Sequence, residues 1–114
     1  MCGVTGFWLD KNIALCNPSE ILTRMTESLD HRGPDSHGHF VNSDDNIGFG
    51  HSRLSILDLS SNGHQPMESL SQRFVITFNG EIYNHLSIRA LLTNEFPSIF
   101  WRGTSDTETL LMAI

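Results

Sequence analysis

The residues best suited to covalent chemistry stand at the start of the chain, where Cys2 follows Met1. If Met1 is removed, Cys2 carries both a thiol and a primary amine. Such an amine titrates at roughly 7.7–8.0, so part of it is unprotonated near neutral pH and can accept the thiol proton. Cys2 would then be a nucleophile with its own base. While Met1 is attached, the nitrogen is a non-basic amide, so this chemistry depends on one cleavage.

Other polar residues that could take part in a site are Arg53, the pair Asn79-Gly80 and Asp106. Each also has an ordinary structural explanation. An Asn-Gly pair after a strand is typical of a tight turn, because both residues tolerate positive φ. An arginine on a strand is commonly solvated, and an aspartate in the first turn of a helix serves the cap and the dipole. Only their combination can indicate a site.

The six histidines raise the question of a metal site. His37 and His39 alternate along one predicted strand and so share a face. No third ligand stands at a spacing typical of zinc or other transition-metal sites. We therefore predict no metal in this chain.

Length and composition limit the classes of protein. The 114 residues make one domain or part of one, and 39% hydrophobic with 18% charged residues is ordinary for a globular chain. A formal charge of −6 argues against binding to nucleic acid or to anionic membranes. The longest apolar stretches are too short to span a membrane, and no secretory signal is evident, so we expect a cytoplasmic protein. Two cysteines form no disulfide framework, and Cys16 is interpreted as a small buried residue.

Hydrophobic patterning predicts an α+β order of elements. A first strand is expected to begin at Cys2 and run through residues 4–9, and another covers residues 74–78. Between them, residues 40–41 and 47–49 are expected to form a hairpin whose second strand runs on to residue 57. A helix is expected from an Asn17 cap to a point before Gly33, a second over 84–95, and a third after a capping box at Ser105. Four or five strands cannot easily form two stacked, covered sheets, so a layered architecture would need further chain.

Six short motifs occur in one order along the chain. They are Met1-Cys2-Gly3-Val4, His31-Arg32-Gly33-Pro34-Asp35, Arg53-Leu54-Ser55-Ile56, Gln65-Pro66-Met67, Phe78-Asn79-Gly80-Glu81-Ile82-Tyr83-Asn84 and Gly103-Thr104-Ser105-Asp106-Thr107-Glu108. Together they closely resemble the glutaminase domain of the asparagine synthetase family. The members of this family are class II glutamine amidotransferases with an N-terminal nucleophile. The resemblance runs from residue 2 to residue 111.

The resemblance implies hydrolysis of glutamine to glutamate and ammonia. The Cys2 thiolate would attack the side-chain amide and form a tetrahedral oxyanion and then a thioester. The side-chain amide of Asn79 and the backbone N–H of Gly80 are the oxyanion hole that the family implies. Residues 31–35 are assigned to a structural loop near the pocket.

The resemblance also implies how the free amino acid is held. Arg53 would bind the α-carboxylate with its planar guanidinium, and Glu81 with Asp106 would bind the α-ammonium. Backbone atoms near Ile56 and Leu57 would contact the ligand, as would Asn79 and Gly80. Asparagine, which is one methylene shorter, should fail mainly in rate because its amide lies away from the thiol.

The fold implied by the resemblance is the N-terminal-nucleophile αββα sandwich, incomplete here, with the second half of the domain expected to be absent. Residues 1–114 would be the N-terminal part of a glutaminase domain with no synthetase domain. No cofactor is expected in this chain, and ATP with Mg²⁺ would belong to the synthetase domain. The partners implied are L-glutamine and a synthetase domain on the same polypeptide or on another chain, and a homodimer stays open.

A second hypothesis, from a different class of protein, is a truncated or non-catalytic chain that keeps these motifs and serves binding or assembly. Retention of Met1 would favour it, because the Cys2 nitrogen would stay an amide.

Overall fold

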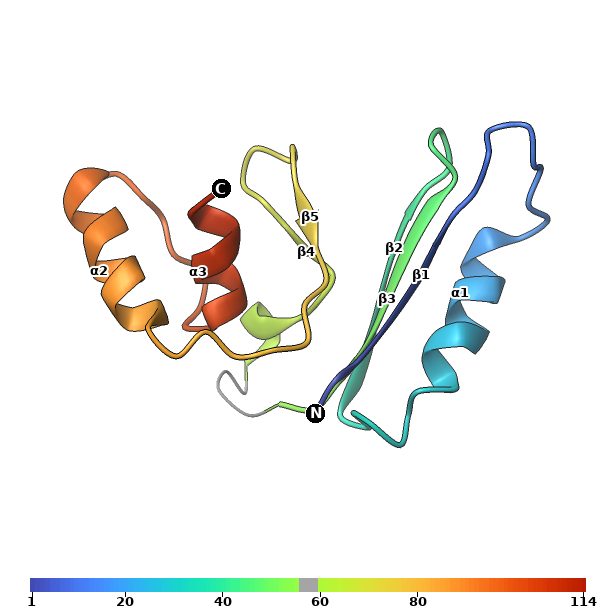
Figure 1. Cartoon of the computed structure of the whole chain (residues 1–114), viewed down its shortest axis with the longest axis horizontal. Coiled ribbons are helices and arrows are strands. Elements are labelled where there is room, and N and C mark those ends of the chain that lie inside the picture. The colour runs from blue at the N-terminus through green and yellow to red at the C-terminus, as the bar shows by residue number, and fades with distance from the viewer. Residues whose placement is uncertain (56–59) are drawn as a thin grey trace.

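The computed structural model describes residues 1–55 and 60–114. Strands and helices alternate unevenly along this part of the chain (Figure 1). In order, they are β1 (Gly3–Trp8), α1 (Pro18–Glu27), β2 (Ser36–Asn42), β3 (Ile47–Arg53), the short 3-10 turn η1 (Ser61–Gly63), β4 (Met67–Glu68), β5 (Val75–Ile76), α2 (His85–Glu95) and α3 (Asp106–Met112).

The strands β1, β3 and β2 form one antiparallel sheet with β3 in the centre. Gly3 lies opposite Ser52, and Ser36 lies opposite Arg53. The start of β1, the start of β2 and the end of β3 therefore meet at one end of the sheet. The N-terminus lies at this end, between the two halves of the molecule (Figure 1).

Helix α1 packs against all three strands and covers one face of the sheet (Figure 1). Its residues Leu22 and Thr26 are fully buried, and burial of one leucine side chain contributes roughly 1.5–3 kcal/mol. Gly50 of β3 lies so close to this helix that a side chain there would collide with the Thr26 hydroxyl. Leu29, which follows the helix, packs in the same way on Gly3. The start of β1 is thus anchored next to the position of Cys2.

The other half of the molecule contains the β4–β5 pair, α2 and α3, with α2 packed on α3. Glu108 of α3 is 1% exposed and accepts hydrogen bonds from the backbone N–H groups of Arg102 (2.6 Å) and Gly103 (3.0 Å). The guanidinium of Arg89 lies 3.7 Å from the Glu108 carboxylate and 3.9 Å from the ring centroid of Trp101. These contacts fix the segment that leads into α3.

Most of the predicted elements are confirmed, but two strands are shorter than predicted. The strand expected to run on to residue 57 ends at Arg53, and neither Leu54 nor Ser55 continues it. The segment 74–78, which has the strongest β propensity, pairs only at Val75–Ile76, because β4 offers only Met67–Glu68 as a partner. Asn17 stands at the N-cap of α1, but in a left-handed conformation (φ 68°) and without a side-chain capping bond. Its amide instead donates to Glu20 at 2.8 Å.

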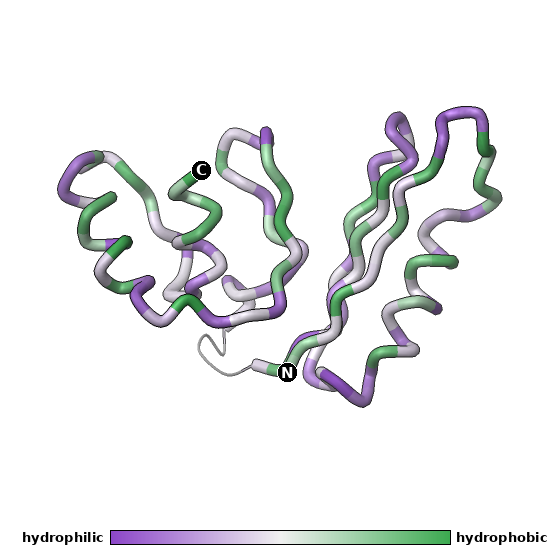
Figure 2. Tube along the Cα trace, in the orientation of Figure 1, coloured by the Kyte–Doolittle hydropathy of each residue, from purple (hydrophilic) through white to green (hydrophobic). Residues whose placement is uncertain are grey.

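The mixed α+β class is confirmed by this order of elements. Apolar burial is sparse: the hydrophobic side chains that are buried within residues 1–55 and 60–114 are Leu22, Met67 and Leu111. Figure 2 shows hydrophilic residues at the tip of the β2–β3 hairpin, as the polar segment 42–46 predicts. None of the helices that the structure describes is both long and apolar enough to cross a membrane.

Candidate active site

A cavity of about 350 Å³ lies where five segments meet: the start of β1, the end of β3, the segment from η1 to β4, the loop after β5 and the start of α3. The predicted site residues that line it are Cys2, Arg53, Asn79, Gly80, Glu81 and Asp106. Residues far apart in the sequence thus converge on one hollow. The predicted contacts at Ile56 and Leu57 lie outside the residues that the structure describes.

Cys2 is half-buried at the edge of this cavity. Its Sγ accepts a hydrogen bond from the backbone N–H of Leu54 at 3.3 Å and lies 3.5 Å from the Leu54 carbonyl oxygen. An N–H directed at the sulfur is a favourable contact for a thiolate. Met1 is exposed and lines the same cavity. Removal of Met1 would therefore free the Cys2 amine at the cavity itself.

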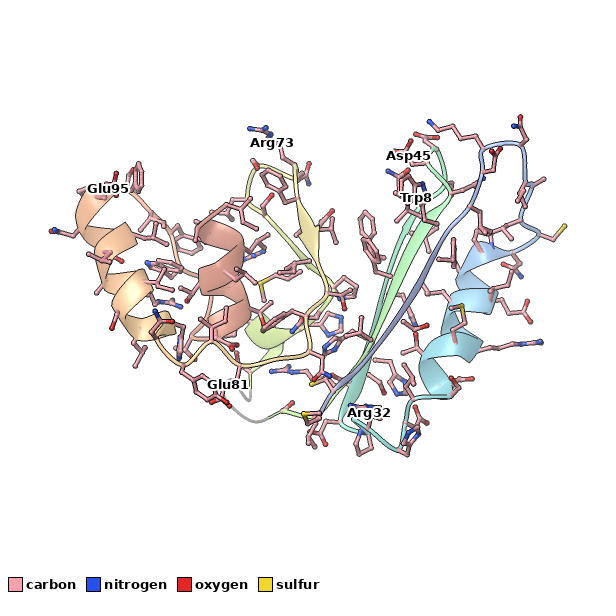
Figure 3. The ribbon with its side chains drawn as sticks, viewed as in Figure 1. Trp8, Arg32, Asp45, Arg73, Glu81 and Glu95 are labelled. Atoms are coloured by element: carbon pink, nitrogen blue, oxygen red, sulfur yellow. The ribbon has the colours of Figure 1, made fainter. Side chains whose placement is uncertain are left out.

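The loop over residues 31–35 holds Cys2 and the end of β3 together. Nε of Arg32 donates to the Cys2 carbonyl at 3.2 Å. The Asp35 carboxylate accepts from the N–H of Ser55 at 2.7 Å, and the Asp35 N–H donates to the Arg53 carbonyl at 2.9 Å. In Figure 3 Arg32 and Glu81 lie on either side of the N-terminal end that Figure 1 marks. The expectation of a structural loop near the pocket agrees with these contacts.

Arg53 is 9% exposed at the end of β3 and lines the cavity. Its Nη1 donates to the carbonyl of Ser60 at 2.9 Å, which orients the guanidinium. A planar guanidinium can hold a carboxylate through two parallel hydrogen bonds. Arg53 therefore brings a guanidinium to the lining that also contains the acidic residues Glu81 and Asp106.

Asn79, Gly80 and Glu81 form an exposed segment that lines the cavity. The alternative interpretation of Asn79-Gly80 as a turn with positive φ is wrong, because neither residue has positive φ. Gly80 instead packs closely on Phe78, since a Cβ there would lie 2.6 Å from the tip of the Phe78 ring and the ring would have to shift. The same absence of a side chain leaves the Gly80 backbone open to a close approach from the cavity.

Asp106 begins α3 and is 5% exposed. One carboxylate oxygen accepts from the N–H of Ile82 at 2.9 Å and the other from the N–H of Thr107 at 2.8 Å. Ser105 caps the helix as predicted, its hydroxyl accepting from the Glu108 N–H at 3.1 Å. The reciprocal half of the capping box is wrong, because the Glu108 carboxylate turns to the segment before the helix.

Several buried residues of the lining were not predicted to belong to the site, and His51 and Gln65 are the largest of them. Burial lowers the pKa of His51, and the nearby backbone of Phe78 only partly opposes that shift. Neither ring nitrogen of His51 makes a hydrogen bond of ordinary geometry among residues 1–55 and 60–114. The strand alternation places His51 and Arg53 on one face of β3, which is a signal that could have indicated His51.

Two further expectations concern residues away from the cavity. Cys16 is exposed, so its interpretation as a buried residue is wrong. It follows the apolar residues 13–15, but these lie in a loop rather than in a packed element. Within the part of the chain that the structure describes, no three His, Cys, Asp or Glu side chains are grouped so that they could hold a metal ion. His37 instead pairs with Asp30, with 2.7 Å between Nε2 and Oδ1.

The chain matches the family model described as a glutamine amidotransferase domain over residues 1–114. It is 40% identical over 112 residues to an asparagine synthetase (glutamine-hydrolyzing) 1 of Bacillus subtilis, covering 97% of this chain and 17% of that protein. It is 37% identical over 120 residues to the amidase chyE of Penicillium rubens, with coverages of 97% and 17%.

A third relative is a putative asparagine synthetase (glutamine-hydrolyzing) 2 of Methanocaldococcus jannaschii, 37% identical over 128 residues. That alignment covers 97% of this chain and 23% of the relative. The chain therefore spans less than a quarter of the length of these relatives, although each match covers 97% of this chain.

Proposed function

The chain belongs to the glutamine amidotransferase domain family, and from that premise we propose that its cavity hydrolyses glutamine to glutamate and ammonia. The observation that carries the proposal is the convergence of Cys2, Arg53 and Asp106 with the Asn79-Gly80 segment on one cavity. A nucleophile, a cation and an anion around a hollow of about 350 Å³ match the reacting amide and the charged end of a free amino acid.

Cys2 is the proposed nucleophile once Met1 has been removed. Its free amine accepts the thiol proton, and the thiolate attacks the side-chain amide carbon of glutamine. The C–N bond of the tetrahedral intermediate breaks, and the departing nitrogen takes the proton from the Cys2 ammonium, so that ammonia leaves and a thioester remains. Water, deprotonated by the same amine, then attacks the thioester carbon. The C–S bond of the second tetrahedral intermediate breaks, the Cys2 thiolate takes the proton back from the ammonium, and glutamate is released.

Asn79 and Gly80 are the proposed donors to the developing oxyanion. Asn79 and Gly80 line the same cavity as Cys2, which supports the proposal that the Asn79 side-chain amide and the Gly80 N–H donate to the oxyanion. Loss of one such donor in comparable sites raises the barrier by about 3–4 kcal/mol. A larger residue at position 80 would force either the Phe78 ring or this segment to shift.

The charged end of glutamine is proposed to lie between Arg53 and the two acidic residues. Arg53 holds the α-carboxylate, and Asp106 with Glu81 holds the α-ammonium. Asp106 already accepts two backbone hydrogen bonds, but a carboxylate offers roughly four lone-pair positions, so an ammonium can still bind to it. Backbone atoms of Ile56 and Leu57 are proposed as further contacts.

The finer architecture and the wider activity also remain proposals. We propose that this unit is the N-terminal part of an αββα sandwich, which the sparse apolar burial and exposed side chains such as Leu86, Leu91 and Phe100 support. The names of the relatives support a synthetase domain, on the same polypeptide or on a partner chain, that uses the ammonia to make asparagine. ATP and Mg²⁺ would act there, whereas the glutaminase step as derived needs no cofactor.

The test uses the chain with Met1 removed and an electrophilic glutamine analogue that carries a diazoketone in place of the amide. We expect a single adduct at Cys2, slowed by added glutamine. Cys16 is a matched control within the same molecule, since it is the more exposed thiol and would react first with a non-selective reagent. Labelling that persists in Cys2→Ala, or that favours Cys16, would refute the proposal and leave the non-catalytic hypothesis.

A further inference from the structure

Gln65 connects three parts of the molecule whose relative positions matter to the proposed reaction: the sheet, the segment that leads into Asn79 and the first turn of α3. It is 7% exposed and lines the cavity. Its side chain carries both an acceptor and a donor, and both are used within the cavity wall. A buried glutamine with both ends satisfied restrains the groups on either side of it.

The first end of the Gln65 side chain holds the segment that leads into Asn79. Oε1 accepts a hydrogen bond from the backbone N–H of Phe78 at 2.6 Å. The second end holds the first turn of α3, where Nε2 donates to Oγ1 of Thr107 at 3.1 Å. One side chain therefore links the residue before Asn79 to the residue after Asp106.

A second link closes the same frame on the other side of the Asn79-Gly80-Glu81 segment. The Asp106 carboxylate accepts from the N–H of Ile82 at 2.9 Å. The segment is thus held at residue 78 and at residue 82, and both holds end on the first turn of α3. The two ends of the segment therefore cannot move away from α3 without breaking one of the two links.

The backbone of Gln65 also fixes this frame to the sheet. Gly38 of β2 lies so close that any side chain there would collide with the Gln65 carbonyl. Gly38 is paired with His51 of β3, the strand that ends at Arg53. Gln65 consequently sits between the sheet, which carries Cys2 and Arg53, and the two segments that carry the remaining groups.

We propose that Gln65 is a positioning residue that fixes the distance between the Asn79-Gly80 donors and Asp106, and so aligns the substrate amide with Cys2. The inference rests on the proposed glutaminase function for its catalytic consequence. Gln65 touches neither the substrate nor the reacting atoms in this account. Its removal should therefore leave the charged end of glutamine bound and misplace the amide, and a misplacement of the order of 1 Å can lower the rate about 10²-fold.

The test compares Gln65→Met, which keeps the length of the side chain and removes both hydrogen bonds, with Thr107→Val, which removes only the acceptor on α3. The double variant completes the cycle. Thr26→Val is the matched control, because Thr26 is also a buried side chain with one hydrogen bond, to Leu22 at 2.9 Å, but lies in α1 away from the cavity. Turnover is expressed per Cys2 thiol that the diazoketone analogue titrates, so that a loss of folded protein does not lower the measured kcat.

We expect kcat to fall about 10- to 100-fold in Gln65→Met and less in Thr107→Val, with the KM for glutamine changed by no more than about twofold. The double variant should be no worse than Gln65→Met, because the Thr107 bond is already lost there. Thr26→Val should change at most the melting temperature and keep the wild-type kcat. An unchanged kcat per titrated thiol in both Gln65→Met and Thr107→Val would overturn the inference.

Hydrogen exchange tests the frame without reference to turnover. In Gln65→Met the amide of Ile82, which Gln65 does not touch, should exchange about tenfold faster or more, whereas the Ala113 amide at the end of α3 should not change. Unchanged exchange at Ile82 would overturn the frame. A wild-type chain without turnover would instead overturn the proposed function and the catalytic consequence, and Ile82 would still decide whether Gln65 holds the segment.

Discussion

Replacement of Asp106 by asparagine separates the two tasks that the structure and the proposed function give to one carboxylate. The two oxygens accept the N–H groups of Ile82 and Thr107 at 2.9 and 2.8 Å in a position that is 5% exposed. Asparagine keeps the shape but has one acceptor oxygen, so its amide NH₂ must face one of the two N–H donors. One charge-assisted bond is lost, and one buried N–H loses its partner.

The expected magnitudes follow from those two losses. The free energy of unfolding should fall by about 1.5–3 kcal/mol, the range for a hydrogen bond to a charged group in a buried position. Glutamine affinity should fall by about 10- to 100-fold, because its ammonium loses an opposite charge. Urea unfolding measures the first quantity. Titration calorimetry in a Cys2→Ala background measures the second without turnover.

The control for Asp106→Asn is Glu20→Gln on α1. Glu20 makes an exposed pair with Arg24 at 2.9 Å, and such pairs add little to stability. We expect no measurable change in unfolding or in glutamine affinity for this variant. If Asp106→Asn lowers stability and leaves affinity intact, the carboxylate holds only the segment at Ile82 and the ammonium role is refuted. If neither quantity changes, the reasoning from hydrogen bonds is refuted as a whole.

Three further predictions concern the other residues of the cavity. Asn79→Ala should lower kcat by about 10²–10³ with little change in the KM for glutamine, and a steady-state assay that finds only a higher KM would count against the oxyanion role. Arg53→Ala should raise the KM by about 10- to 100-fold, and a loss confined to turnover would exclude it as the carboxylate anchor. The pKa of His51 is lowered by burial, with the charges of His64 and Arg53 acting in the same direction, so the unfolded chain binds this proton more readily than the folded one. The contribution of neutral His51 to the free energy of unfolding should thus be complete above about pH 6.5 and be lost as the pH falls through the lowered pKa. Urea midpoints measured between about pH 7 and 5 should decline less in His51→Gln than in the wild-type chain, and equal declines would contradict the prediction.

The sheet and the caps were predictable because local patterns determine them. The polar segment 42–46 between two β-favouring runs gave the β2–β3 hairpin, and Ser105 followed by Glu108 gave the start of α3. The extent of pairing was not predictable in the same way. Residues 74–78 have high β propensity, yet only Val75–Ile76 pairs, because strand length depends on the partner that the fold supplies.

The site shows the same division between local and tertiary information. Cys2, Arg53, Asn79 and Asp106 could be identified through motifs, and the structure brings them to one cavity. The contribution of Gln65 could not be predicted, because its two hydrogen bonds join residues 13 and 42 positions away in the sequence. Buried polar bridges of this kind depend on which backbone groups the tertiary fold leaves to be satisfied.

The most direct measurement of the central claim is the release of glutamate and ammonia from glutamine by the chain before and after treatment with methionine aminopeptidase. We expect equal amounts of the two products after Met1 is removed, negligible release before, and none from the treated Cys2→Ala variant. Hydrolysis that is independent of Met1 removal, or that survives the loss of the Cys2 thiol, would contradict the account.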